Sequence, residues 1–246
     1  MEGMSQRSKN MWLVFNARHA NLQGVEEDLE AGADIDFEQP DSGTNTKTAL
    51  FAACANGDLD MVRLLLRKGA SVSKRIKCSC APLHAAASAG LTKTAELLVN
   101  AGATLDIRDC LQFTPLMRAC AYKQVDTVRR LIELGARVDL TDDYCQIAQR
   151  FGTEVGCRHW EECMKLIQEA RKSRLLRCCN PKCGKPGYRS TGALKLCARC
   201  KMTRYCSRDC QKQHWSIGHK KCCGQDAYPK KCCGHNAYPV KQTKAT

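Results

Sequence analysis

The stretch "TALFAACANGDLDMVRLLLRKGASV", residues 48–72, decides the fold, because two later stretches repeat its pattern. They are "APLHAAASAGLTKTAELLVNAGATL", residues 81–105, and "TPLMRACAYKQVDTVRRLIELGARV", residues 114–138. Equivalent positions lie 33 residues apart, as Leu50, Leu83 and Leu116 show, and a "GA" pair closes each stretch. A fixed period of this length predicts stacked helical units, because one short unit can bury its apolar face only against its neighbours.

Each unit is predicted to contain two helices. Thr114 and Pro115 favour a helix start, because a threonine hydroxyl caps free N–H groups and proline fits the first turn. Small alanines let the paired helices pack closely; they are Ala52, Ala53, Ala85 and Ala86. The second helix has one apolar face. Its residues are Val62, Leu65, Leu66, then Ala95, Leu98, Val99, then Val128, Leu131, Ile132. Glycines, which adopt a left-handed conformation at little cost, end these helices. They are Gly69, Gly102 and Gly135.

Degenerate units flank the three clear ones. "GVEEDLEAGADI", residues 24–35, repeats the pattern with Asp28 in place of a leucine. At the other end, Cys163, Leu166 and Ile167 match the apolar spacing of the second helix. Polar substitutions are expected in terminal units, because the ends of a solenoid must face water. We therefore predict a mainly α solenoid of about five units over residues 11–171.

The period, the T-P-L-H-x-A-type opening and the closing "GA" resemble the ankyrin repeat. The resemblance implies an array that binds proteins on a concave face without doing chemistry. His84 is the fourth residue of the opening motif, and we expect it to hydrogen-bond within the repeat rather than to act as a ligand or catalyst. Cys54 and Cys120 occupy equivalent helix positions, where a small buried side chain is expected.

Cys78 and Cys80 form a C-x-C sequence on the loop before the third repeat, next to Lys74, Arg75 and Lys77. A solvated loop is the expected interpretation. A metal or redox role is the alternative.

Charge and cysteine content divide the chain near residue 171. Residues 1–170 hold 20 Lys+Arg and 23 Asp+Glu, a net charge of −3, whereas residues 171–246 hold 19 and 2, a net charge of +17. The sequence has no apolar run of the roughly 18 residues that span a bilayer, and no uninterrupted apolar core of a secretory signal at its start. Nineteen cysteines without an export signal favour reduced thiols and metal ligands rather than disulfides.

Residues 178–223 read "CCNPKCGKPGYRSTGALKLCARCKMTRYCSRDCQKQHWSIGHKKCC". The spaced pairs are Cys178/Cys183, Cys197/Cys200 and Cys206/Cys210, followed by His219 and Cys222-Cys223. A short pair points two thiolates at one ion, and two pairs close a tetrahedral site. Eight ligands therefore predict two zinc ions, whose binding supplies folding free energy that a core of this size cannot.

"YCSRDCQKQHW" followed by "HKKCC" resembles the MYND-type zinc finger, over residues 178–223. The resemblance implies that alternate ligand pairs share one ion. One zinc would be held by Cys178, Cys183, Cys206 and Cys210, and the other by Cys197, Cys200, His219 and Cys223. Such fingers take up short peptides that contain proline and leucine, and the residues expected to touch them here are Gln211 and Trp215. The alternative for Trp215 is a place in the core of the small domain.

Two ligand assignments stay open. Cys179 is the alternative to Cys178, and Cys222 is the alternative to Cys223. The last pair belongs to a ten-residue unit written twice, "KKCCGQDAYPKKCCGHNAYP" at residues 220–239. The second copy has no partner pair left, so we predict that residues 224–246 form a disordered basic tail.

The combined architecture resembles the ankyrin repeat and MYND domain proteins. The resemblance implies a non-catalytic adaptor that binds proteins or peptides, in the cytoplasm or nucleus. Nucleic-acid binding by the basic region is the alternative, because phosphate contacts need only Lys and Arg. Few aromatic residues there are available to stack bases, which argues against it. The chain has neither room nor motif for a catalytic domain, so we expect no enzyme activity.

Overall fold

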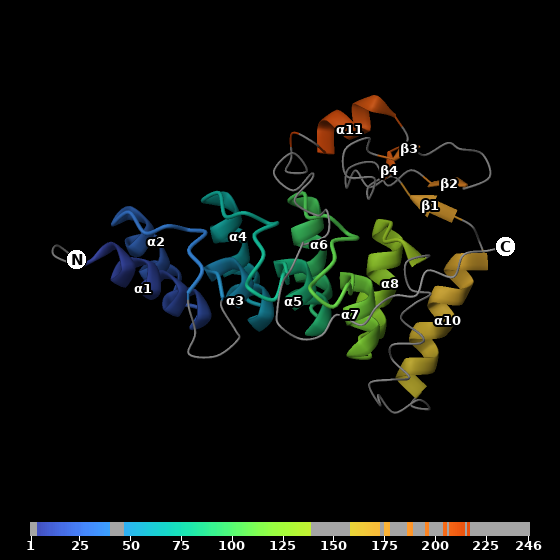
Figure 1. Ribbon diagram of the computed structural model, residues 1–246, viewed down its shortest axis with the longest axis horizontal. Coiled ribbons are helices and arrows are strands. Elements are labelled where there is room, and N and C mark those ends of the chain that lie inside the picture. The colour runs from blue at the N-terminus through green and yellow to red at the C-terminus, as the bar shows by residue number, and fades with distance from the viewer. Residues whose placement is uncertain are drawn as a thin grey trace.

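The computed structural model describes residues 4–39, 47–138 and 158–172, and short segments at 175–177, 186–188, 195–196, 204–205, 207–214 and 216. Up to residue 138, the described helices stand in pairs, side by side in one row (Figure 1). One longer helix packs against the last pair. The mainly α, stacked arrangement confirms the predicted fold class.

Four helix pairs make up the row. They are α1 (Gln6–Arg18) with α2 (Leu22–Glu30), α3 (Ala49–Asn56) with α4 (Leu59–Arg67), α5 (Pro82–Ser88) with α6 (Thr92–Asn100), and α7 (Pro115–Ala121) with α8 (Val125–Leu134). Among the described helices, none is both long enough and apolar enough to cross a membrane.

The ends of these helices follow the capping signals in the sequence. The hydroxyl of Thr114 accepts a hydrogen bond from the N–H of Met117, at 3.3 Å, and so caps α7. After the second helices, Gly69, Gly102 and Gly135 have φ angles of 96°, 100° and 104°. These are left-handed conformations that side chains with a Cβ rarely adopt, which confirms the predicted helix ends.

The buried core repeats with the sequence period. Leu50, Leu83 and Leu116 are all 1% exposed or less. The first helices α1, α3, α5 and α7 pack closely along the whole row. The second helices α2, α4 and α6 touch one another less, whereas α6 and α8 pack closely.

Asp28, in the degenerate first unit, is buried rather than facing water. Its side chain sits on α2 at 1% exposure, and its Oδ2 accepts a hydrogen bond from Asn16 Nδ2 on α1, at 2.8 Å. A buried polar atom needs such a partner. The expectation of a water-facing polar residue is therefore wrong for Asp28, because Asn16 supplies the bond that water would have made.

Helix α10 (Arg158–Lys172) packs on α7 and α8 and forms the last layer of the array. Cys163 and Ile167 are fully buried and Leu166 is half-buried, which confirms the apolar spacing expected of a last unit. The guanidinium of Arg171 donates to the carbonyl oxygen of Val138 at 3.2 Å and ties this helix to the preceding repeat.

Beyond α10, the described segments are two short antiparallel strand pairs and a helix. The pairs are β1 (Leu175–Arg177) with β2 (Pro186–Tyr188), and β3 (Lys195–Leu196) with β4 (Arg204–Tyr205). Helix α11 (Arg208–His214) follows β4 and packs against it. Strand β1 starts three residues after Lys172, the last residue of α10.

Candidate interaction surface and metal centre

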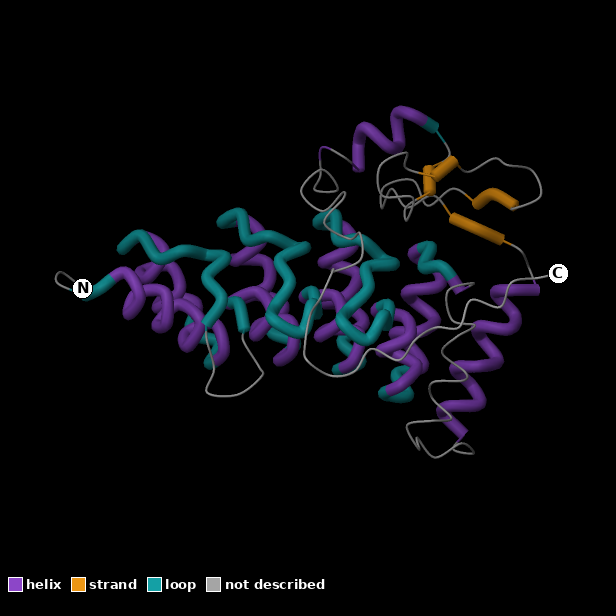
Figure 2. Tube along the Cα trace, in the orientation of Figure 1, coloured by secondary structure: helices purple, strands orange, loops and turns teal. Residues whose placement is uncertain are grey.

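Loops that join one helix pair to the next project from the row as fingers, drawn in teal in Figure 2. We call residues 31–39 the first finger, residues 68–81 the second finger and residues 101–114 the third finger. Hydrogen bonds connect them. Asp36 Oδ1 accepts from the N–H of Ser71 at 2.9 Å, and Arg75 Nη1 donates to the carbonyl of Arg108 at 2.7 Å. The fingers therefore form a connected edge along the array.

Asp109 organises the third finger from inside. Its side chain is fully buried, and Oδ1 accepts from the N–H groups of Leu111 at 2.8 Å and Phe113 at 2.9 Å. Oδ2 accepts from Arg118 Nε at 2.7 Å. The guanidinium of Arg118 lies 5.2 Å from the centre of the Phe113 ring. Burial by itself lowers the pKa of Arg118, but Asp109 outweighs it and raises that pKa above its ordinary value. The charge of Arg118 is thus retained in a half-buried position.

His84 links the second and third fingers, as expected of the opening motif. Its Nδ1 accepts from the N–H of Ala81 at 3.1 Å, and its Nε2 lies 2.9 Å from the carbonyl oxygen of Phe113. A carbonyl only accepts, so the proton sits on Nε2. Burial lowers the pKa of the imidazole to about 4, although Asp109 acts in the opposite direction. His84 is therefore neutral at pH 7, and the predicted hydrogen-bonding role is confirmed.

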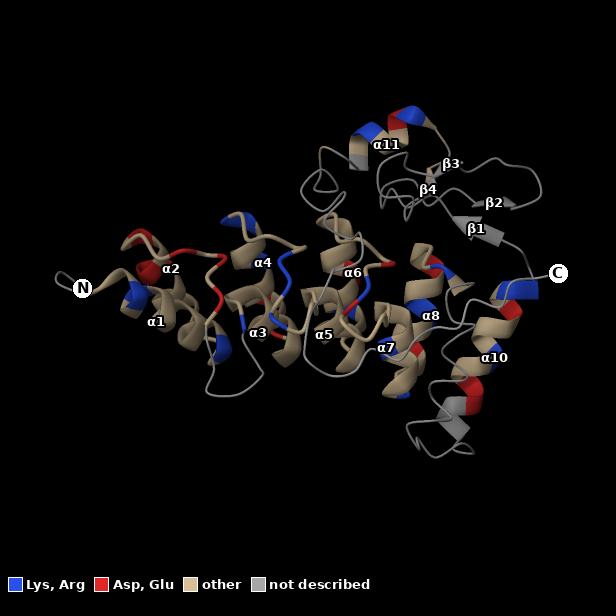
Figure 3. Cartoon of the chain, viewed as in Figure 1, with Lys and Arg blue, Asp and Glu red and all other residues tan. Residues whose placement is uncertain are grey.

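Charges change sign from the first finger to the second (Figure 3). The first finger carries acidic side chains, which are Asp34, Asp36 and Glu38. The second finger carries basic side chains, which are Lys68, Lys74, Arg75 and Lys77. One large apolar side chain, Leu111, lies on the third finger at 51% exposure. Tyr122, at 55% exposure, follows the last residue of α7, at the end of that helix away from the finger. A partner lying along the fingers would thus meet acidic groups, then basic groups and then Leu111.

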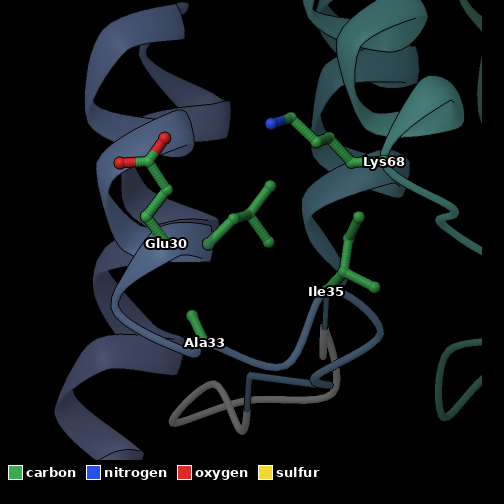
Figure 4. A pocket seen from close by; sticks show the side chains of 5 residues that line it. Glu30, Ala33, Ile35 and Lys68 are labelled. Atoms are coloured by element: carbon green, nitrogen blue, oxygen red, sulfur yellow. The ribbon is translucent and has the colours of Figure 1, made fainter.

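A hollow of about 310 Å³ lies between α2 and α4 (Figure 4). Leu29, Ala33 and Ile35 line it with apolar groups. Glu30 and Lys68 stand on opposite walls, and Lys68 extends its ammonium group toward the Glu30 side. The hollow is small and open, and of a size for a single side chain of a partner.

The described strands bracket the predicted zinc ligands. Cys178 and Cys183 fall in the connection between the paired strands β1 and β2, whose register joins Arg177 with Pro186. Cys197 and Cys200 fall in the connection between β3 and β4. An antiparallel pair brings the two ends of its connection together, which suits two thiolates that must reach one ion. The backbone therefore fits a zinc site at each hairpin.

Cys210 is the predicted ligand that the described residues contain. It is half-buried in the first turn of α11, and its N–H donates to the hydroxyl of Ser207 at 3.1 Å. The predicted peptide contact Gln211 follows it and is also half-buried. The other predicted sites lie outside the described residues. They are Cys178, Cys183, Cys197, Cys200, Cys206, His219, Cys223 and Trp215. Within the described ranges, no three potential ligands gather around one point.

Comparison with known families agrees with this division. The model described as "Ankyrin repeats (3 copies)" matches residues 13–109 and 72–142, and together these ranges span just over half of the 246 residues. The chain belongs to the ankyrin-repeat family. The model described as "MYND finger" matches residues 178–223, so a finger of the zinc-binding MYND type follows the array. Both are non-catalytic protein-interaction modules.

One relative supports the repeats alone. The chain is 42% identical over 79 residues to "Ankyrin repeat and KH domain-containing protein mask-1" of Caenorhabditis elegans. The match covers 32% of this chain and 3% of that protein. The similarity therefore concerns a short piece of a much longer protein.

Sequence reasoning missed the buried pair of Asp109 and Arg118. The signal was present, because an aspartate five residues before Thr114 and an arginine four residues after it enclose a stretch without other charges. The charges alone did not show that the aspartate turns inward to bind the backbone of its own finger.

Proposed function

We propose that this chain is a non-catalytic adaptor. The concave face of its array, with the fingers, binds one protein, and its zinc finger binds short peptides that contain proline and leucine. The observation that carries the proposal is the connected finger edge, where bonds such as Asp36 to Ser71 hold charged loops in a fixed order. An edge held in advance loses less conformational entropy when a partner binds.

The order of charges specifies how a partner would lie. Its basic residues would meet the first finger, and its acidic residues would meet Lys74 and Lys77 of the second finger. Leu111 of the third finger offers apolar contact area beyond them. Large exposed side chains at the centre of an interface carry much of its energy, whereas rim charges mainly set orientation and on-rate.

The zinc finger would act as a rigid support for a peptide. Eight protein ligands on two ions leave no open coordination position for water, so the metal is structural. Gln211 lies on α11, and Trp215 follows it by four residues in the sequence. Residues four apart share one face of a helix, so the two side chains would form one patch if the helical spacing continues.

The array is tested with one charge reversal and a matched control. Partners captured from the source cells with the full chain are identified, purified and titrated against the variants. Lys77→Glu, on the second finger, should raise the dissociation constant at least about fivefold. Lys93→Glu, an exposed change on α6 away from the fingers, should leave it unchanged. Equal binding by both variants and the parent chain would contradict the finger edge.

The peptide patch is tested on zinc-loaded protein. Trp215→Ala and Gln211→Ala should each abolish capture of a proline- and leucine-containing peptide while both zinc ions stay bound. Zinc content and peptide binding are measured on the same preparation. Undiminished capture by zinc-loaded Trp215→Ala would refute the patch and leave the array as the recognition surface.

Nucleic-acid binding is the second candidate, favoured by the net charge of +17 in residues 171–246. It predicts affinity for random-sequence duplex that falls steeply as salt is raised. The adaptor proposal predicts peptide binding that depends little on salt. The proposal also assigns residues 11–171 to the array, 178–223 to the finger and 224–246 to a basic tail, in a cytoplasmic or nuclear protein.

A further inference from the structure

The tip of the second finger holds two cysteines around a closed turn. The N–H of Ser79 donates to the carbonyl of Ile76 at 2.7 Å, and the N–H of Ile76 donates to the carbonyl of Cys80 at 3.0 Å. Ser79 sits at φ 57°, in the left-handed region. This turn places Cys78 and Cys80 beside each other, and both are half-buried rather than fully solvated.

The two thiols are in direct contact. The thiol of Cys80 hydrogen-bonds to the sulfur of Cys78, and this bond lowers the pKa of Cys78 to about 6, although burial acts against it. The same bond, together with burial, raises the pKa of Cys80. The contact therefore favours the thiolate form of Cys78 and the thiol form of Cys80. A thiolate is the form of cysteine that reacts with oxidants.

Nearby charges act on this tip in both directions. Asp109 raises the pKa of both thiols, and Arg118 lowers that of Cys80 to a smaller extent. Arg75 and Lys77 precede the tip in the sequence. The N–H of Cys110, on the third finger, donates to the carbonyl of Cys78 at 3.2 Å and fixes the tip against its neighbour.

Two other sets of thiols lack one of these properties. Cys54 is fully buried, and burial raises its pKa. Cys120 and Cys163 hydrogen-bond to each other as Cys78 and Cys80 do, but both are fully buried between α7 and α10. Cys120 and Cys163 are in contact but are not accessible to solvent. Cys54 is not accessible either. The pair at the tip of the second finger differs from all three because its thiols are only half-buried.

We propose that Cys78 and Cys80 form a modification site, at which hydrogen peroxide converts the dithiol to a disulfide within the second finger. The Cys78 thiolate attacks peroxide, an S–O bond forms, the O–O bond breaks, and the departing hydroxide takes a proton to become water. Cys80 sulfur then attacks the sulfenic acid of Cys78, an S–S bond forms, and the S–O bond breaks. The Cys80 proton leaves with the oxygen as a second water. A small dithiol reductant reverses the change.

Peptide masses of the full, zinc-loaded chain test this site separately from the zinc ligands. The protein is treated with a small molar excess of hydrogen peroxide, alkylated under denaturing conditions and digested with trypsin. Cleavage after Lys77 and Lys93 yields residues 78–93, which contain Cys78 and Cys80 and no other cysteine. This peptide should escape alkylation and appear lighter by two hydrogen masses. Residues 48–63, with Cys54, and residues 159–165, with Cys163, should be alkylated.

Two variants test whether Cys78 is oxidised first and Cys80 then attacks it. In Cys80→Ser, the reaction should stop at the sulfenic acid of Cys78, which a 1,3-diketone captures. In Cys78→Ser, loss of the free Cys80 thiol should slow at least about tenfold, because the reactive thiolate is gone. Helical circular dichroism of both variants checks that the array is intact.

Three outcomes would overturn the proposal. One is residues 78–93 remaining fully alkylatable at peroxide doses that oxidise other cysteines. Another is a cross-link from residues 78–93 to residues 109–118, which would make Cys110 the partner. The third is equal loss of the Cys80 thiol in Cys78→Ser and the parent chain. The experiment measures the oxidation state of one peptide. Its result is therefore independent of whether the chain acts as an adaptor.

Discussion

Acidification should destabilise the array through His84. The imidazole is buried between its bonds to Ala81 and Phe113, and its folded pKa of about 4 lies below the ordinary value of 6.5. Because the folded pKa is lowered, the unfolded chain takes up the proton first as pH falls. The stabilisation is therefore complete above pH 6.5 and is lost as the pH falls toward 4.

The size of this loss follows from proton linkage. For one group with these two pKa values, the free energy of unfolding falls by about 2 kcal/mol at pH 5 and by about 3 kcal/mol at pH 4. Carboxylates elsewhere in the chain, and zinc release in acid, also change stability over this range. A comparison of two proteins at each pH removes these shared contributions.

The assay is urea unfolding of the full chain, followed by helical circular dichroism from pH 7.5 to 4, for the parent chain and His84→Gln. Glutamine does not titrate and can keep one of the two hydrogen bonds, so the variant should be about 1–3 kcal/mol less stable at pH 7.5. The difference in unfolding free energy between the parent chain and His84→Gln should be smaller by about 3 kcal/mol at pH 4 than at pH 7.5. A gap that stays constant from pH 7.5 to 4 would refute the assignment of a buried, neutral His84.

Three further predictions concern the array and the zinc finger. Gly57→Ala should destabilise the array more than Gly69→Ala, measured by urea unfolding. Both positions have a left-handed φ, which costs a residue with a Cβ about 1–2 kcal/mol. Of the two, only Gly57 would bring its new Cβ against a neighbouring side chain, at 2.6 Å. Equal losses of stability would show that this contact relaxes freely. Chelation at neutral pH should release two zinc ions per chain and unfold the finger while the helical signal stays nearly constant; a metal content of one ion or none in fresh reduced protein would contradict two sites. Cys223→Ser should lower zinc content more than Cys222→Ser, and deletion of residues 224–246 should change it little; a zinc lost on that deletion would assign a ligand to the tail.

The repeat part of the fold was predictable because its signals are local and recur. Leu50 and its counterparts fix the period, and the glycine at 69 recurs with the same left-handed backbone one and two periods later. The role of His84 followed from its place in the opening motif. The role of each of these residues can be predicted from its position in the repeat and its spacing along the sequence.

The errors and omissions concern residues whose environment depends on a distant partner. Asp28 looked like a water-facing residue until Asn16, on the preceding helix, was found to satisfy it. The contact between Cys120 and Cys163 joins two helices separated by more than one repeat, and no spacing rule indicates it. Pairings of this kind are set by packing in three dimensions, so one sequence does not reveal them.

The short step from α10 to β1 limits how a partner with two binding segments can use this chain. Leu175 follows Lys172 by three residues, so the chain between their Cα atoms can span at most about 11 Å, whatever path it takes. A connection this short keeps the start of the zinc finger at the end of the ankyrin array. A partner segment bound on one module would therefore hold a second segment at high local concentration near the other. Only a partner whose two segments are spaced to reach both modules would benefit from this higher local concentration. The short connection would therefore select among partners by that spacing.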